Sequence, residues 1–201
     1  METNAALPAG WIVTYTGRRV WPLDLRAEDV VEDDIAHALA MKVRWGGFCR
    51  SFYSVAQHTV LLTDWLGHSG ANWQDQWDAL HHDDVGVYLA DVPAPLRRVL
   101  DGYDEVEAHV WSVIAGVFDC SAMFSDTLRT ADRRIRIDEA RVLMTMPAGS
   151  WGGHDGGLEP LGVLIEPWGP DEAKGRWLTT FNRLQAARPA QPFRRTAAAD
   201  F

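Results

Sequence analysis

Apolar residues recur at helical spacing along most of this chain, and this periodicity constrains the fold more than any other feature of the sequence. In the first such run, residues 32–44, Ile35 and Leu39 lie about one helical turn apart, and a pair of glycines ends the run. The same spacing is present in later segments, namely residues 55–66, 73–83, 103–118, 124–144 and 170–187. By contrast, residues 11–21 alternate as a β-hairpin does. The sequence therefore predicts an all-α fold, a helical bundle with a small N-terminal β-hairpin.

Side-chain chemistry marks the start of two of these helices. Ser54 and Gln57 have the spacing of a capping box, in which the hydroxyl accepts the amide of residue 57 and the Gln57 side chain reaches back. A helix should therefore start at Val55 and place His58 in its first turn. Pro170 suits the first position of the last helix.

The longest predicted helix has carboxylates on its apolar stripe. The stripe includes Leu128, Ile135 and Val142, and Asp132 and Glu139 fall on the same side. A carboxylate in such a position costs desolvation free energy unless it is paired or binds a cation. Asp132 is therefore a candidate metal ligand. The alternative is a salt bridge to a nearby arginine, which could be Arg129, Arg133 or Arg136.

The bulk composition fits one domain. The 201 residues are 47% apolar, which is enough to close a single core. We expect this domain to cover residues 1–187, and we expect residues 188–201, which are basic and contain proline, to be disordered. No stretch has the length needed to cross a bilayer, and the N-terminus lacks a basic start and an apolar segment. The expected location is the cytoplasm, with no membrane partner.

Net charge limits the class of partner. The formal charge of −9 argues against binding to a nucleic acid polymer, because such proteins gain affinity by neutralising many phosphates. A small phosphorylated substrate is still compatible if a metal ion and a few arginines make the site locally positive. Cys49 and Cys120 are far apart and form no CxxC motif, so neither a disulfide framework nor a cysteine zinc site is expected.

Four side chains could together hold a divalent metal ion such as Co, Mn, Zn, Fe or Mg: His58, His82, Asp83 and Asp132. Taken singly, each has a simpler explanation. A lone histidine is more often a packed or surface residue, and adjacent residues on a regular helix diverge by about 100°. Taken together, the four residues predict a metal site on converging helices and point to metal-assisted hydrolysis.

The motifs around these residues resemble those of HD-domain metal-dependent phosphohydrolases. The chain carries Tyr53-Ser-Val-Ala-Gln-His58, then Ala79-Leu-His-His82-Asp83, then Tyr88-Leu-Ala-Asp91-Val-Pro93-Ala-Pro95-Leu-Arg97, and finally Thr130-Ala-Asp132-Arg-Arg. The similarity covers about residues 11–186 and is to bacterial 5′-deoxynucleotidases and phage-encoded dATP triphosphohydrolase-like proteins. It implies a helical HD domain that hydrolyses a small (deoxy)nucleotide, as mono- or triphosphate, with metal-activated water. It also implies a homo-oligomer, in the host cytoplasm if the chain is phage-encoded.

The resemblance assigns roles to further residues. Arg44 would contact the substrate phosphate and Trp45 would abut the base. Asp91 would contact the sugar hydroxyl, Pro95 would line the base pocket, and Arg97 would lie near the phosphate tail. Each has a plainer alternative: a surface charge for the arginines, core packing for Trp45 and a turn cap for Asp91.

One position departs from the pattern of these enzymes. Gly86 stands where they usually carry a glutamate that positions or deprotonates the attacking water. The candidate catalytic carboxylates are therefore Asp83 and the neighbouring Asp84, although a two-residue shift turns a helical side chain by about 200°. His81 could donate to phosphate or simply pack. Two alternative functions stay open: a catalytically impaired protein that binds or senses nucleotides, and an HD phosphodiesterase.

Overall fold

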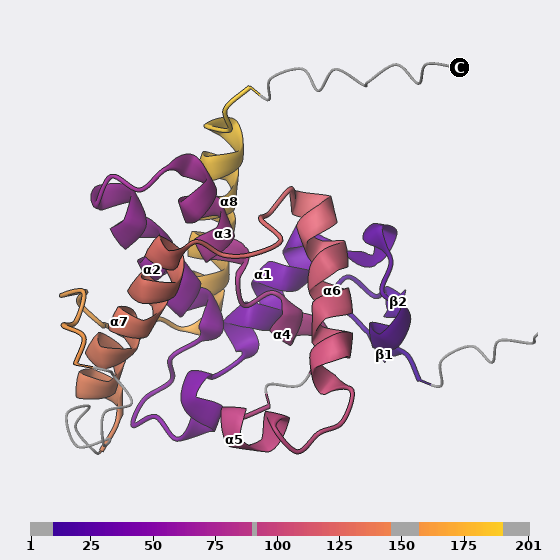
Figure 1. Cartoon of the computed structure of the whole chain (residues 1–201), viewed down its shortest axis with the longest axis horizontal. Helices are drawn as coiled ribbons and strands as arrows, with labels where there is room; N and C mark the ends of the chain where they lie inside the picture. Colours follow the sequence, from indigo (N-terminus) through magenta and orange to yellow (C-terminus); the bar gives the residue numbers. More distant parts are fainter. Residues whose placement is uncertain (1–9, 90–91, 146–156, 191–201) are drawn as a thin grey trace, which may run out of the picture.

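The computed structural model describes residues 10–89, 92–145 and 157–190, and most of them are helical (Figure 1). The strands β1 (Ile12–Val13) and β2 (Arg19–Val20) form an antiparallel hairpin, in which Ile12 lies opposite Val20. The helices, in chain order, are α1 (Glu32–Met41), α2 (Val55–His68), α3 (Trp73–His81), α4 (Val85–Tyr88), α5 (Ala94–Arg97), α6 (Tyr103–Phe118), α7 (Asp126–Leu143) and α8 (Pro170–Ala186). The 3-10 turns are η1 (Pro22–Asp24), η2 (Ala27–Asp29) and η3 (Arg44–Gly47). The predicted all-α class with an N-terminal hairpin is confirmed.

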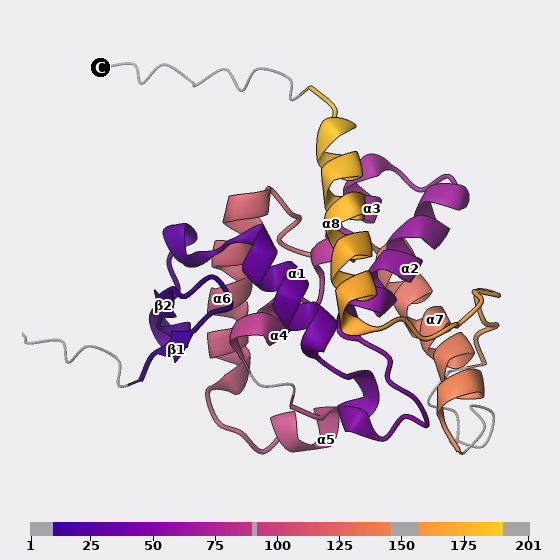
Figure 2. The same ribbon diagram turned by 180° about the vertical axis from the view of Figure 1, so that it is seen from behind.

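The bundle is organised around α2. Helix α8 packs against α1, α2 and α3, and Figure 2 shows it running along these three helices. Helix α7 packs on α2 and α3, while α6 covers α4 on the side of the hairpin (Figure 1). Fully buried side chains such as Leu39, Leu80, Ile114 and Trp177 join the helices into one core. This packing brings α2, α7 and the end of α3 together at one place.

The first helix ends earlier than the periodicity predicts. It stops at Met41, three residues before Arg44, because Lys42 is extended and Val43 pairs with Ser54 in an isolated β-bridge. The Arg44 amide then donates to the Tyr53 carbonyl at 2.9 Å. Arg44 is thereby placed in η3, beside the start of α2, rather than at a helix end.

The helix starts are confirmed, but the capping box is only half formed. The Ser54 hydroxyl accepts the Gln57 amide at 3.1 Å, and α2 begins at Val55 as predicted. The Gln57 side chain does not reach back. It instead donates to the Glu166 carbonyl at 2.7 Å and accepts from the Trp168 amide at 2.9 Å, which ties α2 to the segment before α8. Helix α8 begins at Pro170.

The predicted apolar stripe of α7 is confirmed at Leu128 and Ile135, which are buried. The prediction is wrong at Val142, which is 47% exposed. A seven-residue spacing drifts by about 20° per repeat on a straight helix. After two repeats the inward position has passed to Leu143, which is fully buried. Glu139, by contrast, is fully buried, as its place on the stripe suggests.

No helix within the described part of the chain is long and apolar enough to cross a membrane. Apart from residues 188–190, the segment expected to be disordered lies outside the described residues. Arg188 itself pairs with Asp119 near the end of α6.

Candidate metal centre

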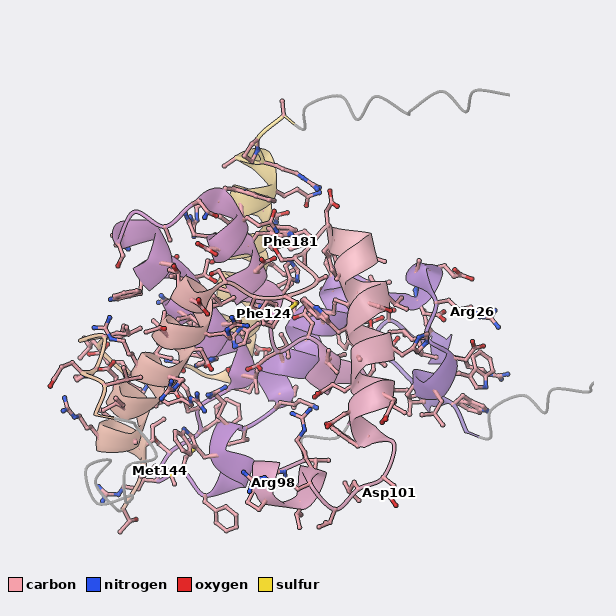
Figure 3. The ribbon with its side chains drawn as sticks, in the orientation of Figure 1. Arg26, Arg98, Asp101, Phe124, Met144 and Phe181 are labelled. Atoms are coloured by element: carbon pink, nitrogen blue, oxygen red, sulfur yellow. The ribbon has the colours of Figure 1, made fainter. Side chains whose placement is uncertain are left out.

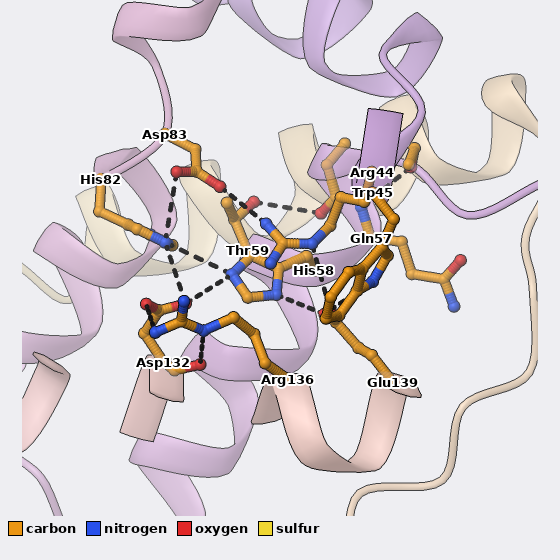
Figure 4. Close-up of polar contacts among 12 residues, drawn as sticks. Arg44, Trp45, Gln57, His58, Thr59, His82, Asp83, Asp132, Arg136 and Glu139 are labelled. Atoms are coloured by element: carbon orange, nitrogen blue, oxygen red, sulfur yellow. Dashed lines mark hydrogen bonds and ion pairs between the residues drawn. The ribbon is translucent and has the colours of Figure 1, made fainter. Parts of the chain in front are cut away.

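His58 lies at the centre of a buried polar cluster. It is in the first turn of α2, and its side chain is fully buried. Its Nδ1 is 2.6 Å from Glu139 Oε1, whereas its Nε2 is 3.3 Å from Asp132 Oδ1 and 3.4 Å from His82 Nε2 (Figure 4). The two ring nitrogens therefore face two different carboxylates of α7.

His82 is oriented by the backbone of its own helix. It is the C-terminal cap of α3, and its Nδ1 donates to the Ala79 carbonyl at 2.8 Å. A carbonyl oxygen can only accept, so the proton of a neutral His82 is on Nδ1. Its Nε2 then offers a lone pair toward His58 and Asp132.

One ligand atom from each of His58, His82 and Asp132 lies within 4.8 Å of the other two. Asp83 adjoins this group, with its Oδ1 at 3.6 Å from His82 Nε2. The two adjacent residues can face one centre because α3 ends at His81 and the chain turns there. Two imidazoles and carboxylate oxygens suit a divalent transition metal such as Mn, Fe, Co or Zn. The donor set therefore fits the metal predicted from the sequence.

The electrostatics of the cluster favour a cation. Burial raises the pKa of Asp132, but hydrogen bonding to His58 and the charge of His82 outweigh it and hold this pKa far below its usual range. Burial also raises the pKa of Asp83, and here His82 and Arg44 outweigh it, so the net pKa is lowered. For His58, burial and Arg44 lower the pKa, but Glu139 and Asp132 prevail and the net pKa is raised. Ionised carboxylates thus surround ring nitrogens that attract positive charge.

Arg44 brings a cation to the edge of this cluster. Its Nη1 donates to Asp83 Oδ2 at 3.1 Å and its Nε donates to Glu139 Oε2 at 3.2 Å. Burial lowers the pKa of Arg44, but these two carboxylates outweigh it and raise the net value, so the guanidinium stays charged. The neighbouring Trp45 donates its ring N–H to the same Glu139 oxygen at 3.2 Å. Two of the residues that were expected near a substrate, Arg44 and Trp45, therefore lie at the edge of the candidate ligands.

Three contributors to this site are not among the site residues predicted from the sequence. Glu139 meets both His58 and Arg44, and Tyr53 donates its hydroxyl to Glu139 at 3.1 Å. Arg136 Nη2 is 3.4 Å from Asp132 Oδ2, so the salt bridge considered for Asp132 exists together with its contacts to the histidines. The apolar stripe of α7 is the sequence signal that could have found Glu139, because a fully buried carboxylate requires partners.

Asp84 is not brought to the cluster. It is fully buried, and its Oδ2 is 2.6 Å from His81 Nδ1. Burial raises its pKa and His81 only partly offsets this effect. This placement does not support the expectation that Asp84 replaces a glutamate at position 86, because the turn after α3 directs Asp84 away from Asp83 and into the core.

His81 packs among aromatic rings instead of facing a substrate. Its ring is stacked on Phe118, with the centroids 4.5 Å apart, and it meets Trp77 edge-on at 4.6 Å. The rings of Trp177 and Phe181 also meet His81 edge-on, and Phe181 is labelled in Figure 3. Of the two roles considered for His81, packing is the one that the structure supports.

Arg97 and Pro95, which were also expected around a substrate, are not gathered at the cluster. Arg97 forms ion pairs with Glu107 and, at 3.6 Å, with Asp104, both on α6. Pro95 is exposed in α5, and Asp91 lies outside the described residues. In Figure 3, Arg98 marks this end of the molecule, apart from Phe124, whose ring lies edge-on to His82 with the centroids 6.2 Å apart.

Fold and site together define an all-helical protein with a buried histidine and carboxylate cluster that fits a divalent metal ion. The chain is 31% identical over 180 residues to the protein of Escherichia coli (strain K12) described as "Uncharacterized protein YfdR", and the match covers 89% of this chain and 97% of that protein. The chain therefore belongs to the same family as YfdR. It is also 28% identical over 144 residues to "Uncharacterized protein RCAP_rcc00048" of Rhodobacter capsulatus, which covers 69% of this chain and 74% of that protein. No family model matches the sequence.

Proposed function

We propose that the protein is a metal-dependent phosphohydrolase of small nucleotides, with His58, His82, Asp83 and Asp132 as the metal ligands. The observation that carries this proposal is the convergence of three ligand atoms within 4.8 Å of one another. The Arg44 guanidinium adjoins them through Asp83. When bound, a divalent ion supplies a Lewis acid and lowers the pKa of water to about 7. The resemblance to HD-domain 5′-deoxynucleotidases supports a deoxynucleotide, as mono- or triphosphate, as the substrate.

In this proposal Arg44 binds the phosphate of the substrate. A guanidinium is a planar fork of donors that matches phosphate oxygens. Glu139 and Asp83 hold the Nε and Nη1 of Arg44 at 3.2 and 3.1 Å, which fixes the plane of the fork before a substrate arrives. Trp45 then lies next to the phosphate site, where it can abut a base. The homo-oligomeric state stays a prediction from the resemblance, and the cytoplasmic location stays a prediction from the sequence.

The test is an assay of phosphate release by purified protein loaded with Co²⁺, Mn²⁺ or Zn²⁺, over a panel of nucleoside mono- and triphosphates. We expect turnover of deoxynucleotides, and we expect Asp132→Ala to reduce it at least about 100-fold, since even partners of a metal ligand typically contribute 10–100-fold. Asp126→Ala, in the exposed first turn of the same helix, is the control and should keep the parent rate. Equal product from Asp132→Ala and the parent would show that the site is assigned wrongly.

A second candidate function, nucleotide binding with little turnover, is favoured by the surroundings of Gly86. A Cβ at this position would meet Lys42 Nζ at 3.5 Å, and this ammonium donates to the carbonyls of Gly86 and Leu89. A cation, rather than a carboxylate, therefore lies beside the position where the resembling enzymes have a glutamate.

Gly86→Glu distinguishes the two functions, and a Cβ at this position makes only an ordinary contact at 3.5 Å. If the parent is a binder, Gly86→Glu should raise turnover by up to about 10²-fold, the lower end of what a general base contributes. Gly86→Ala is the matched control and should leave the rate unchanged. A parent that already turns over deoxynucleotides rapidly excludes the binding function.

A further inference from the structure

Glu139 joins the metal side of the site to the arginine side. It is fully buried on α7, and both of its oxygens are used. Oε1 is 2.6 Å from His58 Nδ1 and accepts the Tyr53 hydroxyl at 3.1 Å. Oε2 accepts from Arg44 Nε and from Trp45 Nε1, both at 3.2 Å. Four side chains, two from η3, one from α2 and Tyr53 between them, thus converge on one carboxylate. Figure 4 shows Arg44, Trp45 and His58 around Glu139.

The identities of these donors fix the direction of every bond. The Arg44 and Trp45 nitrogens can only donate, so Oε2 accepts twice. An ionised carboxylate has no proton to give, and it offers about four acceptor sites, which these contacts fill. His58 must therefore donate from Nδ1. The 2.6 Å contact of Nδ1 with Glu139 is shorter than the 3.3 Å contact of Nε2 with Asp132, so a neutral His58 keeps its single proton on Nδ1 and carries its lone pair on Nε2, which faces His82 and Asp132.

The backbone at Trp45 shows that this arrangement is held under constraint. Trp45 has φ 58° and ψ 26°, the left-handed conformation that residues other than glycine rarely adopt. Such conformations persist where the surroundings fix them and are concentrated at functional sites. Here the bond from the Trp45 ring to Glu139 and the bond from the Arg44 amide to the Tyr53 carbonyl hold the turn.

We propose that Glu139 is the positioning residue of this site, which keeps the proton of His58 on Nδ1 so that Nε2 is free to bind a metal ion, and which fixes the Arg44 fork beside it. This inference rests on the proposed metal-dependent function. Glu139 acts through His58 and Arg44 and is not itself a ligand or a catalytic residue. Partners of this kind orient metal-binding histidines in many sites.

Glu139→Gln gives a sharp prediction, because the amide must place an NH₂ group where a carboxylate oxygen was. If the NH₂ group faces Arg44 and Trp45, it meets two groups that can only donate. If it faces His58 and Tyr53, the hydroxyl can turn and the imidazole can move its proton to Nε2. The second orientation satisfies more bonds, so His58 in this variant should carry its proton on Nε2 and lose the lone pair that a metal needs.

The experiment reads the His58 tautomer by ¹⁵N NMR in the metal-free protein, at an alkaline pH at which the ¹⁵N shifts of His58 no longer change. In the parent we expect the proton on Nδ1, and in Glu139→Gln we expect it on Nε2. Titration with Co²⁺ should show that the affinity of Glu139→Gln is about 10–100-fold lower than that of the parent.

Two variants serve as controls. Asp138→Asn changes the adjacent buried carboxylate of α7, which accepts the amides of Leu161 and Gly162 at 2.8 and 3.1 Å and does not bond the cluster. Tyr53→Phe removes one donor from Glu139 but leaves His58 in place. Both should keep the Nδ1 tautomer, and Asp138→Asn should keep the parent Co²⁺ affinity.

Three outcomes would overturn the proposal: a parent His58 protonated on Nε2, a Glu139→Gln variant that keeps the Nδ1 tautomer, or a tautomer change without loss of Co²⁺ affinity. The first is measured on the parent alone, so the proposal stays testable even if Glu139→Gln fails to fold. A parent that shows the Nδ1 tautomer but binds no Co²⁺, Mn²⁺ or Zn²⁺ would instead contradict the proposed function. Because metal binding is measured first on the parent, this failure is recognised before any variant is compared.

Discussion

Two buried histidine and carboxylate pairs of this protein have different surroundings. In each pair a histidine Nδ1 is 2.6 Å from a carboxylate oxygen and both side chains are fully buried: His58 with Glu139, and His81 with Asp84. The Nε2 of His58 faces His82 and Asp132, whereas the ring of His81 is enclosed by aromatic side chains. None of the described residues offers His81 Nε2 a hydrogen bond.

The comparison indicates that a histidine held by a carboxylate is not by itself a candidate metal site. The carboxylate fixes one ring nitrogen, and the surroundings of the other nitrogen distinguish the two pairs. Around His58 the second nitrogen meets further candidate ligand atoms. Around His81 it meets the core, so this pair is expected to stabilise the fold and to take no part in metal binding.

The largest expected difference between the pairs is in metal affinity. His58→Asn removes a ligand, so Co²⁺ affinity should fall by more than about 100-fold, beyond the 10–100-fold typical of losing a partner of a ligand. His81→Asn should leave the affinity of the folded protein within about threefold of the parent, because His81 faces aromatic rings. Calorimetric titration of both variants measures the difference, with circular dichroism to confirm folding. Equal losses in the two variants would contradict the comparison.

For the free energy of unfolding, in contrast to metal affinity, we expect the larger loss from the His81 variant. His81→Asn leaves the Asp84 carboxylate buried without its partner, and breaking a buried pair in this way costs about 3–5 kcal/mol of unfolding free energy. The double variant His81→Asn, Asp84→Asn removes the charge as well and should recover part of the loss. Denaturant unfolding of the metal-free proteins checks both expectations. A double variant no more stable than the single one would show that packing, and not the stranded charge, accounts for the loss.

The two pairs should also respond to acid in opposite directions. The pKa of Glu139 is lowered from 4.5, because Arg44 and His58 outweigh burial, so its stabilisation is complete above pH 4.5 and is lost as the pH falls through the lowered value. The pKa of Asp84 is raised from 3.8 by burial, so its contribution is present below pH 3.8 and is lost as the pH rises through the raised value.

This contrast can be measured by unfolding the parent and two variants as the pH is lowered from neutral through the acidic range. Relative to the parent, Glu139→Gln should lose less unfolding free energy over this range and Asp84→Asn should lose more. Each unit of pKa difference corresponds to about 1.4 kcal/mol. Parallel curves for the two variants would show that the carboxylates do not differ in the way their surroundings indicate.

The smallest expected effects come from the rings next to each histidine. Phe118→Leu removes a stacked ring from His81 and should cost about 1 kcal/mol of unfolding free energy, within the range of aromatic pairs, without changing Co²⁺ affinity. Phe124→Leu, whose ring lies edge-on to His82, should cost a similar amount and in addition change the KM of a nucleotide substrate. Thermal unfolding and steady-state kinetics of the two variants separate these effects.

The sequence predicts the helices and the positions of the candidate ligands on them because these depend on local patterns. Ser54 places His58 in the first turn of α2 by capping alone, and the apolar stripe of α7 orients Asp132 and Glu139. The sequence does not predict which way Asp84 points, because this depends on α3 ending at His81 and the chain turning there. Likewise, the pairing of Arg97 with α6 depends on how two distant segments pack.

The role of Glu139 is the clearest case of information that arises only in the folded chain. Its partners come from residues 44, 45, 53 and 58, which are about 80 to 95 positions earlier in the sequence. Helical periodicity indicates that Glu139 is buried but cannot indicate what it meets. The turn at Trp45 brings two of these partners to Glu139. Its left-handed conformation is not predictable from the residue type, because tryptophan rarely adopts it.

Anomalous diffraction from crystals of the protein grown with Co²⁺ tests whether the cluster around His58 binds a metal ion, because it locates the ion without reference to activity. We expect one strong peak bounded by His58 Nε2, His82 Nε2 and a carboxylate oxygen of Asp132, with Asp83 beside it and no peak near His81 and Asp84. A structure with no peak among His58, His82 and Asp132, at a Co²⁺ concentration that saturates the protein in solution, would contradict this expectation.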